Sequence, residues 1–446
     1  MRILISGAGE VGTHLAKLLS NEDHDVILMD EDEERLQESS SHFDIMTVLG
    51  SGTSIDDLKG AQVKNCDLFI AVPPYEEVSI LSAILAKKLG AKKTFARINN
   101  FEYLQPENRE YFRELGIDEL IFPENLGARE IVTSLKHVGI RQMFEFSEGR
   151  LLLYAIKLRE NATIVGMTLS EVSELHTDNI YFAVAIVRNG KTIIPRGNEK
   201  FMHNDLAYLI TTKGGLEQLL SDAGKVNHEV KNVMILGGSR IGTKVAKDLE
   251  DLYHVKIIEI DKERSNHLAD VLENTLVIHG DGRNLELLKD EGLNKTDAFI
   301  AVTGNSEVNI LACQLAKKMG VVKTVAEVEN MDYIDLAENI GIGTIINKKL
   351  IAVSHIYRHT LKANVSYVKC LTATDADVLE LIAKEGSKIT KGTLNDLDLP
   401  NDMNVGGIIR GDEVIIPSGK TQVLPNDKVV VFVLPSGVKK VEKMFG

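Results

Sequence analysis

The first third of the chain alternates short apolar runs with longer stretches in which apolar residues recur at helical spacing. Strands are expected at residues 3–6, 25–29, 45–49, 68–72, 94–98 and 119–122, and helices at 13–19, 33–39, 55–61, 78–89 and 126–142. Regular alternation of strands and helices is typical of a parallel sheet with helices on both faces. The pattern therefore predicts an α/β domain of the Rossmann-like, doubly wound type.

The next stretch has a different pattern, in which apolar strands follow one another more closely. Strands are expected at residues 152–158, 180–188, 191–194 and 207–211, followed by a short helix. Asn189 and Gly190 predict a tight hairpin, because both residue types tolerate a positive φ. Asn204 and Asp205 precede a strand and are expected to form a turn. This part is expected to be a small α+β domain.

The second half of the chain repeats the first. Residues 67–103 align with residues 297–333 without a gap, and the carboxyl-terminal parts of the two halves match as well. A repeated unit of this length is too long for a solenoid and predicts tandem domains. The predicted limits are 1–143 for the first α/β domain, 144–221 for the first small domain, 222–231 for a linker, 232–365 for the second α/β domain and 366–446 for the second small domain.

The composition narrows the classes of function. The chain has 446 residues, with 51 Lys and Arg against 65 Asp and Glu, and carries a net charge of −14. Because it lacks a global positive field, we expect no direct binding to nucleic acid or to a lipid surface. Cys66, Cys313 and Cys370 lie far apart, which disfavours a disulfide framework or a zinc site and favours a reducing compartment. The apolar runs are too short to span a bilayer, so no membrane span is expected.

A glycine-rich turn follows the first predicted strand and begins the first helix. Gly7, Gly9 and Gly12 have the GxGxxG spacing, in which the glycines permit a tight turn, the approach of a pyrophosphate and close packing of helix on strand. Asp30 ends the next strand, where a carboxylate would accept hydrogen bonds from ribose hydroxyls and repel a 2′-phosphate. Many glycine turns only connect a strand to a helix. Here the position, the context and the acid together favour NAD or an adenosine nucleotide over NADP.

The corresponding turn of the second half is less regular. Gly237 and Gly242 are present, but Ser239 replaces the middle glycine, and Asp261 is expected to hold the ribose position. A Cβ at residue 239 would push a phosphate outward, whereas the serine hydroxyl could donate to it. Nucleotide binding and a structural copy without a ligand therefore both stay open for this turn.

Two further places differ between the halves. Arg97 aligns with Glu327, and an arginine there would clamp a terminal phosphate, whereas a glutamate would repel one. Gly280 and Asp281 follow a strand at the edge where open sheets bind ligands, although a solvated turn explains them equally well. We hypothesise that the two sites differ in preference and that the first is the better triphosphate site.

These features together resemble the family of potassium uptake regulators built from two regulator-of-K⁺-conductance (RCK) modules. The resemblance rests on the first glycine loop with Asp30, on the segment 297–311 and on the duplicated domain order, and it covers essentially the whole chain. It implies a cytoplasmic protein, peripheral on the inner face of the cell membrane, that forms a homo-oligomer, expected to be a tetramer. It also implies a TrkH-like membrane subunit as partner, whose K⁺ conduction is gated by the binding of NAD(H) and of ATP or ADP.

Carried over by position, the resemblance implies two sets of nucleotide-contacting residues. The first set is Gly7, Ala8, Gly9, Glu10, Val11, Gly12, Asp30, Ser51, Gly52, Thr53, Pro73, Pro74 and Arg97. The second set is Gly237, Gly238, Ser239, Arg240, Ile241, Asp261, Gly280, Asp281, Thr303 and Gly304. Pro73, Pro74 and Ser239 depart from the commonest pattern of the family.

An NAD-dependent oxidoreductase is the main alternative. Such an enzyme needs a proton-transfer group beside the nicotinamide. The histidines are scattered, and the sequence has no GxSxG, HExxH or Walker lysine motif. Duplicated α/β domains followed by small domains suit a sensor better, so neither catalysis nor a metal site is expected.

Overall fold

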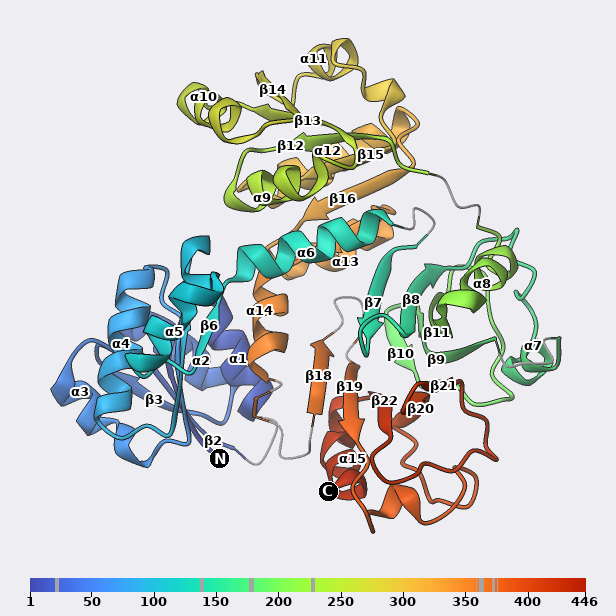
Figure 1. The fold of residues 1–446 in the computed structure, drawn as a ribbon, viewed down its shortest axis with the longest axis horizontal. Coiled ribbons are helices and arrows are strands. Elements are labelled where there is room, and N and C mark those ends of the chain that lie inside the picture. Colours follow the sequence, from blue (N-terminus) through green and yellow to red (C-terminus); the bar gives the residue numbers. More distant parts are fainter. Residues whose placement is uncertain are drawn as a thin grey trace. The chain divides into compact units, whose positions relative to one another are not determined.

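The structure is a computed structural model that describes residues 1–20, 24–136, 140–175, 180–225, 229–357, 359–360, 365–370, 374 and 376–446. Part of the predicted linker, 222–231, lies outside these residues. The chain divides into two compact units. Figure 1 labels their helices and strands. The first unit contains Met1–Leu126 and Lys348–Thr360, and the second contains Gly127–Asn347 and Leu361–Gly446.

The first unit is built on a six-stranded parallel sheet with the order β3-β2-β1-β4-β5-β6. Its strands are β1 (Arg2–Ser6), β2 (Asp25–Asp30), β3 (Met46–Leu49), β4 (Leu68–Ala71), β5 (Lys93–Arg97) and β6 (Glu119–Ile121). Its helices are α1 (Glu10–Ser20), α2 (Glu33–His42), α3 (Ile55–Gly60), α4 (Glu76–Lys88), α5 (Pro106–Glu114) and the start of α6 (Pro123–Leu135). The strand order reverses beside β1, which creates the switch point where sheets of this kind bind ligands. The predicted doubly wound sheet is confirmed.

The first unit also contains α14 (Lys348–Tyr357), a helix from the second half of the chain. α14 lies against α1, and seven of its residues are buried. Beyond its end, the ring of His359 meets Phe95 edge-on, with 4.8 Å between the ring centroids. His355 Nε2 lies 3.4 Å from a carboxylate oxygen of Glu119. A helix that is apolar on most faces needs several partner surfaces. The predicted domain limits did not place this helix of the second half with the first α/β domain.

The second unit contains the second parallel sheet, with the order β14-β13-β12-β15-β16-β17. Its strands are β12 (Asn232–Leu236), β13 (His254–Glu259), β14 (Thr275–His279), β15 (Ala298–Ala301), β16 (Lys323–Glu327) and β17 (Thr344–Ile346). Its helices are α9 (Arg240–Leu249), α10 (Lys262–Val271), α11 (Leu285–Asp290), α12 (Ser306–Lys318) and α13 (Asp332–Asn339). This sheet repeats the strand order of the first, as the duplication predicts.

The second unit also contains two five-stranded antiparallel sheets, with the orders β10-β9-β11-β8-β7 and β18-β19-β22-β20-β21. The first has β7 (Gln142–Phe146), β8 (Leu151–Lys157), β9 (Tyr181–Arg188), β10 (Lys191–Ile193) and β11 (Leu206–Thr212), with α7 (Leu169–Leu175) and α8 (Leu216–Asp222). The second has β18 (Val365–Cys370), β19 (Asp377–Ile382), β20 (Met403–Arg410), β21 (Glu413–Ile415) and β22 (Lys428–Val433), with α15 (Val438–Phe445). Short 3₁₀ turns lie at Val63–Asn65, Phe101–Leu104, Lys213–Gly215, Leu293–Lys295, Lys388–Thr390 and Pro435–Gly437.

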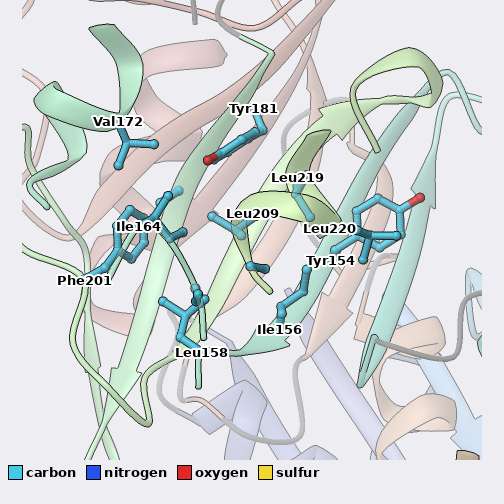
Figure 2. Close-up of a cluster of buried hydrophobic side chains, with 14 of the residues drawn as sticks. Tyr154, Ile156, Leu158, Ile164, Val172, Tyr181, Phe201, Leu209, Leu219 and Leu220 are labelled. Atoms are coloured by element: carbon cyan, nitrogen blue, oxygen red, sulfur yellow. The ribbon is translucent and has the colours of Figure 1, made fainter. Parts of the chain in front are cut away.

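The first small domain has a core of its own. Figure 2 shows Tyr154 and Ile156 from β8 in one cluster with Leu209 from β11 and Leu219 from α8. A second cluster joins the other face of this sheet to the second small sheet, where the rings of Tyr208 and Phe432 lie 5.6 Å apart. The two small sheets therefore share buried apolar surface, which is the main stabilising contribution in such packing.

Some predicted boundaries were wrong. The helix expected at 126–142 spans Pro123–Leu135, and Gln142 instead begins β7, whose alternating pattern buries Phe144 and Phe146. Helix α5 was not predicted, because none of its residues is buried and it has no apolar stripe. Among the described residues, no helix is both long and apolar enough to cross a membrane.

Candidate nucleotide-binding sites

The first glycine loop joins β1 to α1, and backbone packing fixes two of its glycines. Gly7 has a φ of +108°, and a Cβ added there would lie 3.0 Å from the nitrogen of Pro73. A Cβ on Gly12 would lie 1.9 Å from the carbonyl oxygen of Gly7. At Gly9, by contrast, no atom of the described residues other than Gly9 and its two chain neighbours lies within 4 Å of an added Cβ. The middle glycine therefore borders open space that a ligand can reach.

Asp30, the last residue of β2, is hydrogen-bonded to this loop. Its Oδ2 atom accepts the N–H of Ala8 at 2.5 Å, and its Oδ1 atom accepts the N–H of Asp32 at 2.9 Å. The carboxylate therefore lies beside the loop at the carboxyl ends of β1 and β2. This is the place where a nucleotide ribose meets an acidic side chain in Rossmann-like sheets.

The turn after β3 completes this edge of the first site. The N–H of Gly50 donates to the carbonyl of Asp30 at 2.9 Å, which ties the turn to the acid. The hydroxyl oxygens of Ser51 and Thr53 lie 3.0 Å apart. A Cβ on Gly52 would lie 2.3 Å from the hydroxyl of the last residue of β1, so this glycine is needed for packing.

The two prolines after β4 lie on the other side of the loop. Pro73 packs its backbone against Gly7, and the carbonyl of Pro74 accepts the Asn99 side-chain amide at 3.2 Å. Proline has no N–H group, so neither residue can donate a backbone hydrogen bond to a phosphate. Their contribution to a ligand would be contact through the ring or the carbonyl.

Arg97, the last residue of β5, already faces a carboxylate of the protein. Its Nη2 atom lies 3.8 Å from Oε1 of Glu124, and the two side chains are 20% and 8% exposed. Arg97 Nε and Glu124 Oε2 are buried and have no hydrogen-bond partner among the described residues. The guanidinium therefore has a free donor, and a phosphate would have to compete with Glu124 for it.

The second glycine loop repeats the backbone geometry of the first. Gly237 has a φ of +106°, with Thr303 N 2.9 Å from an added Cβ, and a Cβ on Gly242 would lie 2.1 Å from the Gly237 oxygen. Ser239 caps α9. Its hydroxyl oxygen accepts the Gly242 N–H at 3.3 Å, and the hydroxyl donates a hydrogen bond to the Val302 carbonyl at 2.7 Å. The serine hydroxyl is thus used within the protein, which favours a structural role over donation to a phosphate.

The prediction that Asp261 holds the acidic position of the second loop was wrong. Oε2 of Glu259 accepts the N–H of Gly238 at 2.6 Å, and its Oε1 accepts the N–H of Asp261 at 2.8 Å. Glu259 is thus the counterpart of Asp30, and Asp261 caps the next helix as Asp32 does. α9 is one residue shorter than α1, which shifts the register between loop and acid by one. The loop-to-acid spacing alone could not separate the two acids.

The remaining predicted residues of the second site lie near its loop or are hydrogen-bonded to neighbouring side chains of the protein. The Gly280 N–H donates to the Glu259 carbonyl at 2.9 Å, as Gly50 does in the first sheet. The carboxylate of Asp281 is held by Arg283 at 2.7 Å, and this hydrogen bond lowers the pKa of Asp281. Thr303 donates its hydroxyl to the Asn309 side chain at 2.7 Å. Gly304, like Gly9, borders open space among the described residues.

The residues that begin the helix after each loop differ in how far they are exposed to a ligand. Val11 and Ile241 are buried in the core, so only their backbone N–H groups could reach a ligand. Glu10 and Arg240 are exposed at the first positions of α1 and α9. Two residues of the first site were not predicted from the sequence: Glu124, which faces Arg97, and Lys349, whose ammonium donates to the Glu10 carboxylate. Both positions depend on contacts between separate segments of the chain.

Known proteins match the chain throughout its length. The TrkA-N domain family matches residues 3–123 and 233–348, and the TrkA-C domain family matches residues 153–224 and 378–446. The Trk system potassium uptake protein TrkA of Azorhizobium caulinodans is 32% identical, over 100% of this chain and 98% of that protein. A TrkA homolog of Archaeoglobus fulgidus is 31% identical, with both chains covered completely.

Solved structures share the fold. The GsuK RCK domain has a TM-score of 0.60 at 15% identity, covering 100% of this chain and 94% of that one. The GsuK channel bound to NAD has a TM-score of 0.59 at 16% identity, covering 100% of this chain and 78% of that one. At such identities the likeness concerns the fold alone. The relatives above match over the whole chain in sequence, and the chain belongs to the family of Trk system potassium uptake proteins TrkA.

Proposed function

We propose that this chain is a nucleotide-sensing regulatory subunit that controls K⁺ flux through a separate, TrkH-like membrane subunit. The observation that carries the proposal is the pair of glycine loops, each hydrogen-bonded to an acidic side chain at the carboxyl ends of a parallel sheet. Such a loop offers backbone N–H groups and a helix amino end to phosphate, and a carboxylate to ribose. Membership of the TrkA family connects this binding geometry with potassium uptake.

NAD(H) and ATP or ADP are the ligands that we propose. Asp30 and Glu259 would accept ribose hydroxyls and would repel the 2′-phosphate of NADP. GsuK, whose fold this chain shares, has been solved bound to NAD and bound to ADP. The proposed contacts are the two sets that the family resemblance implies, with Glu259 in place of Asp261.

The two sites are proposed to prefer different ligands. The first has Arg97, whose buried Nε is free to donate to a terminal phosphate. The second has Glu327 at the same strand position, only 2% exposed, and a carboxylate there disfavours a further negative charge. On this basis the first site takes the triphosphate.

We also propose that the chain acts as a homo-oligomer of four copies on the cytoplasmic face of the membrane, held there by its partner. The two parallel-sheet domains expose apolar side chains at corresponding places. Leu81 on α4 and Leu311 on α12 are 46% and 69% exposed, and Tyr111 on α5 and Leu336 on α13 are 64% and 54% exposed. Repeated apolar exposure of this kind supports protein–protein contact.

Calorimetric titration of the full chain with ATP, ADP, NAD⁺ and NADH tests the binding step. We expect saturable binding with up to two nucleotides per chain, and loss of one of them in Gly9→Val, which fills the open space of the first loop. Absence of binding by all four nucleotides would contradict the proposal. Steady oxidation of NADH with added oxo-acids would instead favour the oxidoreductase.

A further inference from the structure

Helix α14 brings a lysine from the second half of the chain to the first glycine loop. Lys349 lies in the first turn of α14, and its ammonium donates to the carboxylate of Glu10. Glu10 is the first residue of α1 and directly follows Gly9, the glycine that borders open space. The ion pair therefore lies at the amino end of α1, where the backbone N–H groups of the loop attract an anion.

The two partners of this pair differ in how firmly they are held. The Lys349 side chain is only 19% exposed, whereas that of Glu10 is 65% exposed. Packing along α14 thus limits the positions open to the ammonium, while the carboxylate can turn into solvent with little loss of contact. An anion that approaches the loop can accordingly replace Glu10 as the partner of Lys349.

We propose that Lys349 binds the phosphate groups of the nucleotide in the first site, exchanging Glu10 for phosphate. This inference rests on the proposed function of the loop as a nucleotide site. It makes the first site a composite of both halves of the chain, with the loop from one and the cation from the other. Nucleotide binding would then strengthen the attachment of α14 to α1, and α14 leads along the chain to β18 of the second small domain.

The corresponding position of the first half carries the opposite charge. β6 ends at Ile121 and β17 ends at Ile346, and the third residue after each is Glu124 and Lys349, respectively. Glu124 faces Arg97 rather than supplying a positive charge. Among the described residues, the matching helix position of the first half thus holds an acid and not a lysine, which agrees with a preference of the first site for more highly charged phosphates.

Substitutions of the two partners separate this role from that of a structural ion pair. In titrations of the full chain, Lys349→Met is expected to weaken ATP binding at the first site by roughly tenfold, the effect of one charge-assisted hydrogen bond, and to leave adenosine binding unchanged. Glu10→Gln, which removes the competing carboxylate, is expected to tighten ATP binding. Lys349→Arg should retain most of the affinity, and Lys17→Met, with the same charge change in the last turn of α1, should behave like the parent.

The outcomes distinguish this inference from the broader proposal. If Lys349→Met and Glu10→Gln shift ATP affinity in the same direction, or if they affect ATP and adenosine equally, the pair is structural and the inference fails. If the parent chain binds no nucleotide, the proposed function itself fails. Thermal unfolding of each variant shows whether the fold is retained, and Lys349→Arg provides the comparison if Lys349→Met unfolds.

Discussion

Glu259 Oε2 lies 2.6 Å from the backbone nitrogen of Gly238 and accepts its N–H. Asp30 makes the same bond to Ala8 in the first sheet, although its side chain is one methylene shorter. In both halves the acid ends the second strand, so the carboxylate keeps its place relative to the loop despite the change of residue. Glu259, and not Asp261, is therefore the side chain expected to meet a ribose in the second site.

The first prediction compares the two acids of the second loop. Glu259→Gln should weaken nucleotide binding at the second site by about tenfold, because a charged hydrogen-bond acceptor for the ribose is replaced by a neutral one. Asp261→Asn should have a smaller effect, since Asp261 caps α10 and is two residues further along. Calorimetry on the full chain can measure both, and a larger loss in Asp261→Asn would contradict the assignment.

The glycines of the first loop give a second prediction. Gly12→Ala should lower the thermal unfolding midpoint of the first unit, because its Cβ would lie 1.9 Å from the Gly7 carbonyl oxygen. Gly9→Ala should leave that midpoint unchanged and reduce nucleotide affinity, because its Cβ enters open space near the bound phosphates. If Gly9→Ala lowered stability as much as Gly12→Ala, the space at Gly9 would belong to the fold rather than to a ligand.

A third prediction concerns a buried ion pair in the first small domain. Asp205 is fully buried and accepts two hydrogen bonds from Arg188, at 2.8 Å each, just after the turn that Asn204 forms with a φ of +67°. Asp205→Ala should destabilise this domain by roughly 3 kcal/mol, because it removes a fully buried carboxylate and its two charge-assisted hydrogen bonds from the Arg188 guanidinium, which keeps Glu199 as its remaining acidic partner. Native-state hydrogen exchange of the β11 amides measures the loss.

Asp412→Ala provides the control for that experiment. Asp412 is fully exposed and lies 3.9 Å from Arg150, so water already screens the pair. The exchange rates of β11 should not change in this variant. Equal effects of Asp205→Ala and Asp412→Ala would show that burial does not determine the contribution of the Arg188–Asp205 pair.

A fourth prediction concerns pH. Lys323 begins β16, is 1% exposed and donates to the Ile140 carbonyl at 2.7 Å, and burial lowers its pKa from 10.5 to about 7. Between pH 7 and 10.5 the folded chain has released a proton that the unfolded chain still binds, so stability rises with pH in this range, by at most about 1.4 kcal/mol per pH unit. Below pH 7 Lys323 is protonated in both the folded and the unfolded chain, so its contribution to the pH dependence of the unfolding free energy vanishes.

Lys323→Met should remove this rise, and unfolding measured at several pH values from neutral to alkaline tests it. Lys93 begins β5 at the corresponding place of the first sheet and is exposed. Lys93→Met should therefore keep the pH dependence of the parent. An unchanged slope in Lys323→Met would mean that another group is responsible.

The sequence was sufficient to predict features that depend on local pattern. The alternation of strand and helix patterns predicted the first parallel sheet, the repeat predicted the second, and the Asn189–Gly190 hairpin has the positive φ angles that its residues favour. The glycine spacing predicted a tight turn at Gly7 and close packing of helix on strand at Gly12, and Gly7 has a positive φ while Gly12 has no room for a Cβ. Each of these features depends on neighbours in sequence or on one strand and its adjoining helix.

Features that depend on distant contacts or on strand register could not be predicted in the same way. Asp261 and Glu259 are both acids at a plausible distance from the second loop, and only the pairing of β12 with β13 decides between them. The place of α14 beside α1 depends on packing between halves of the chain, so neither it nor the pair of Lys349 with Glu10 follows from periodicity. The turn at Asn204 was predictable, but the ion pair of Asp205 with Arg188 was not.

K⁺ flux through the membrane partner tests the central claim most directly. The full chain and a TrkH-like subunit would be reconstituted in vesicles, and K⁺ flux measured with ATP, ADP, NAD⁺ and NADH added in turn. We predict that flux changes with the identity of the nucleotide and that Gly9→Val, blocked at the first loop, loses part of this response while retaining its fold. Flux that is the same with all four nucleotides and without them, at concentrations that saturate binding, would contradict the account.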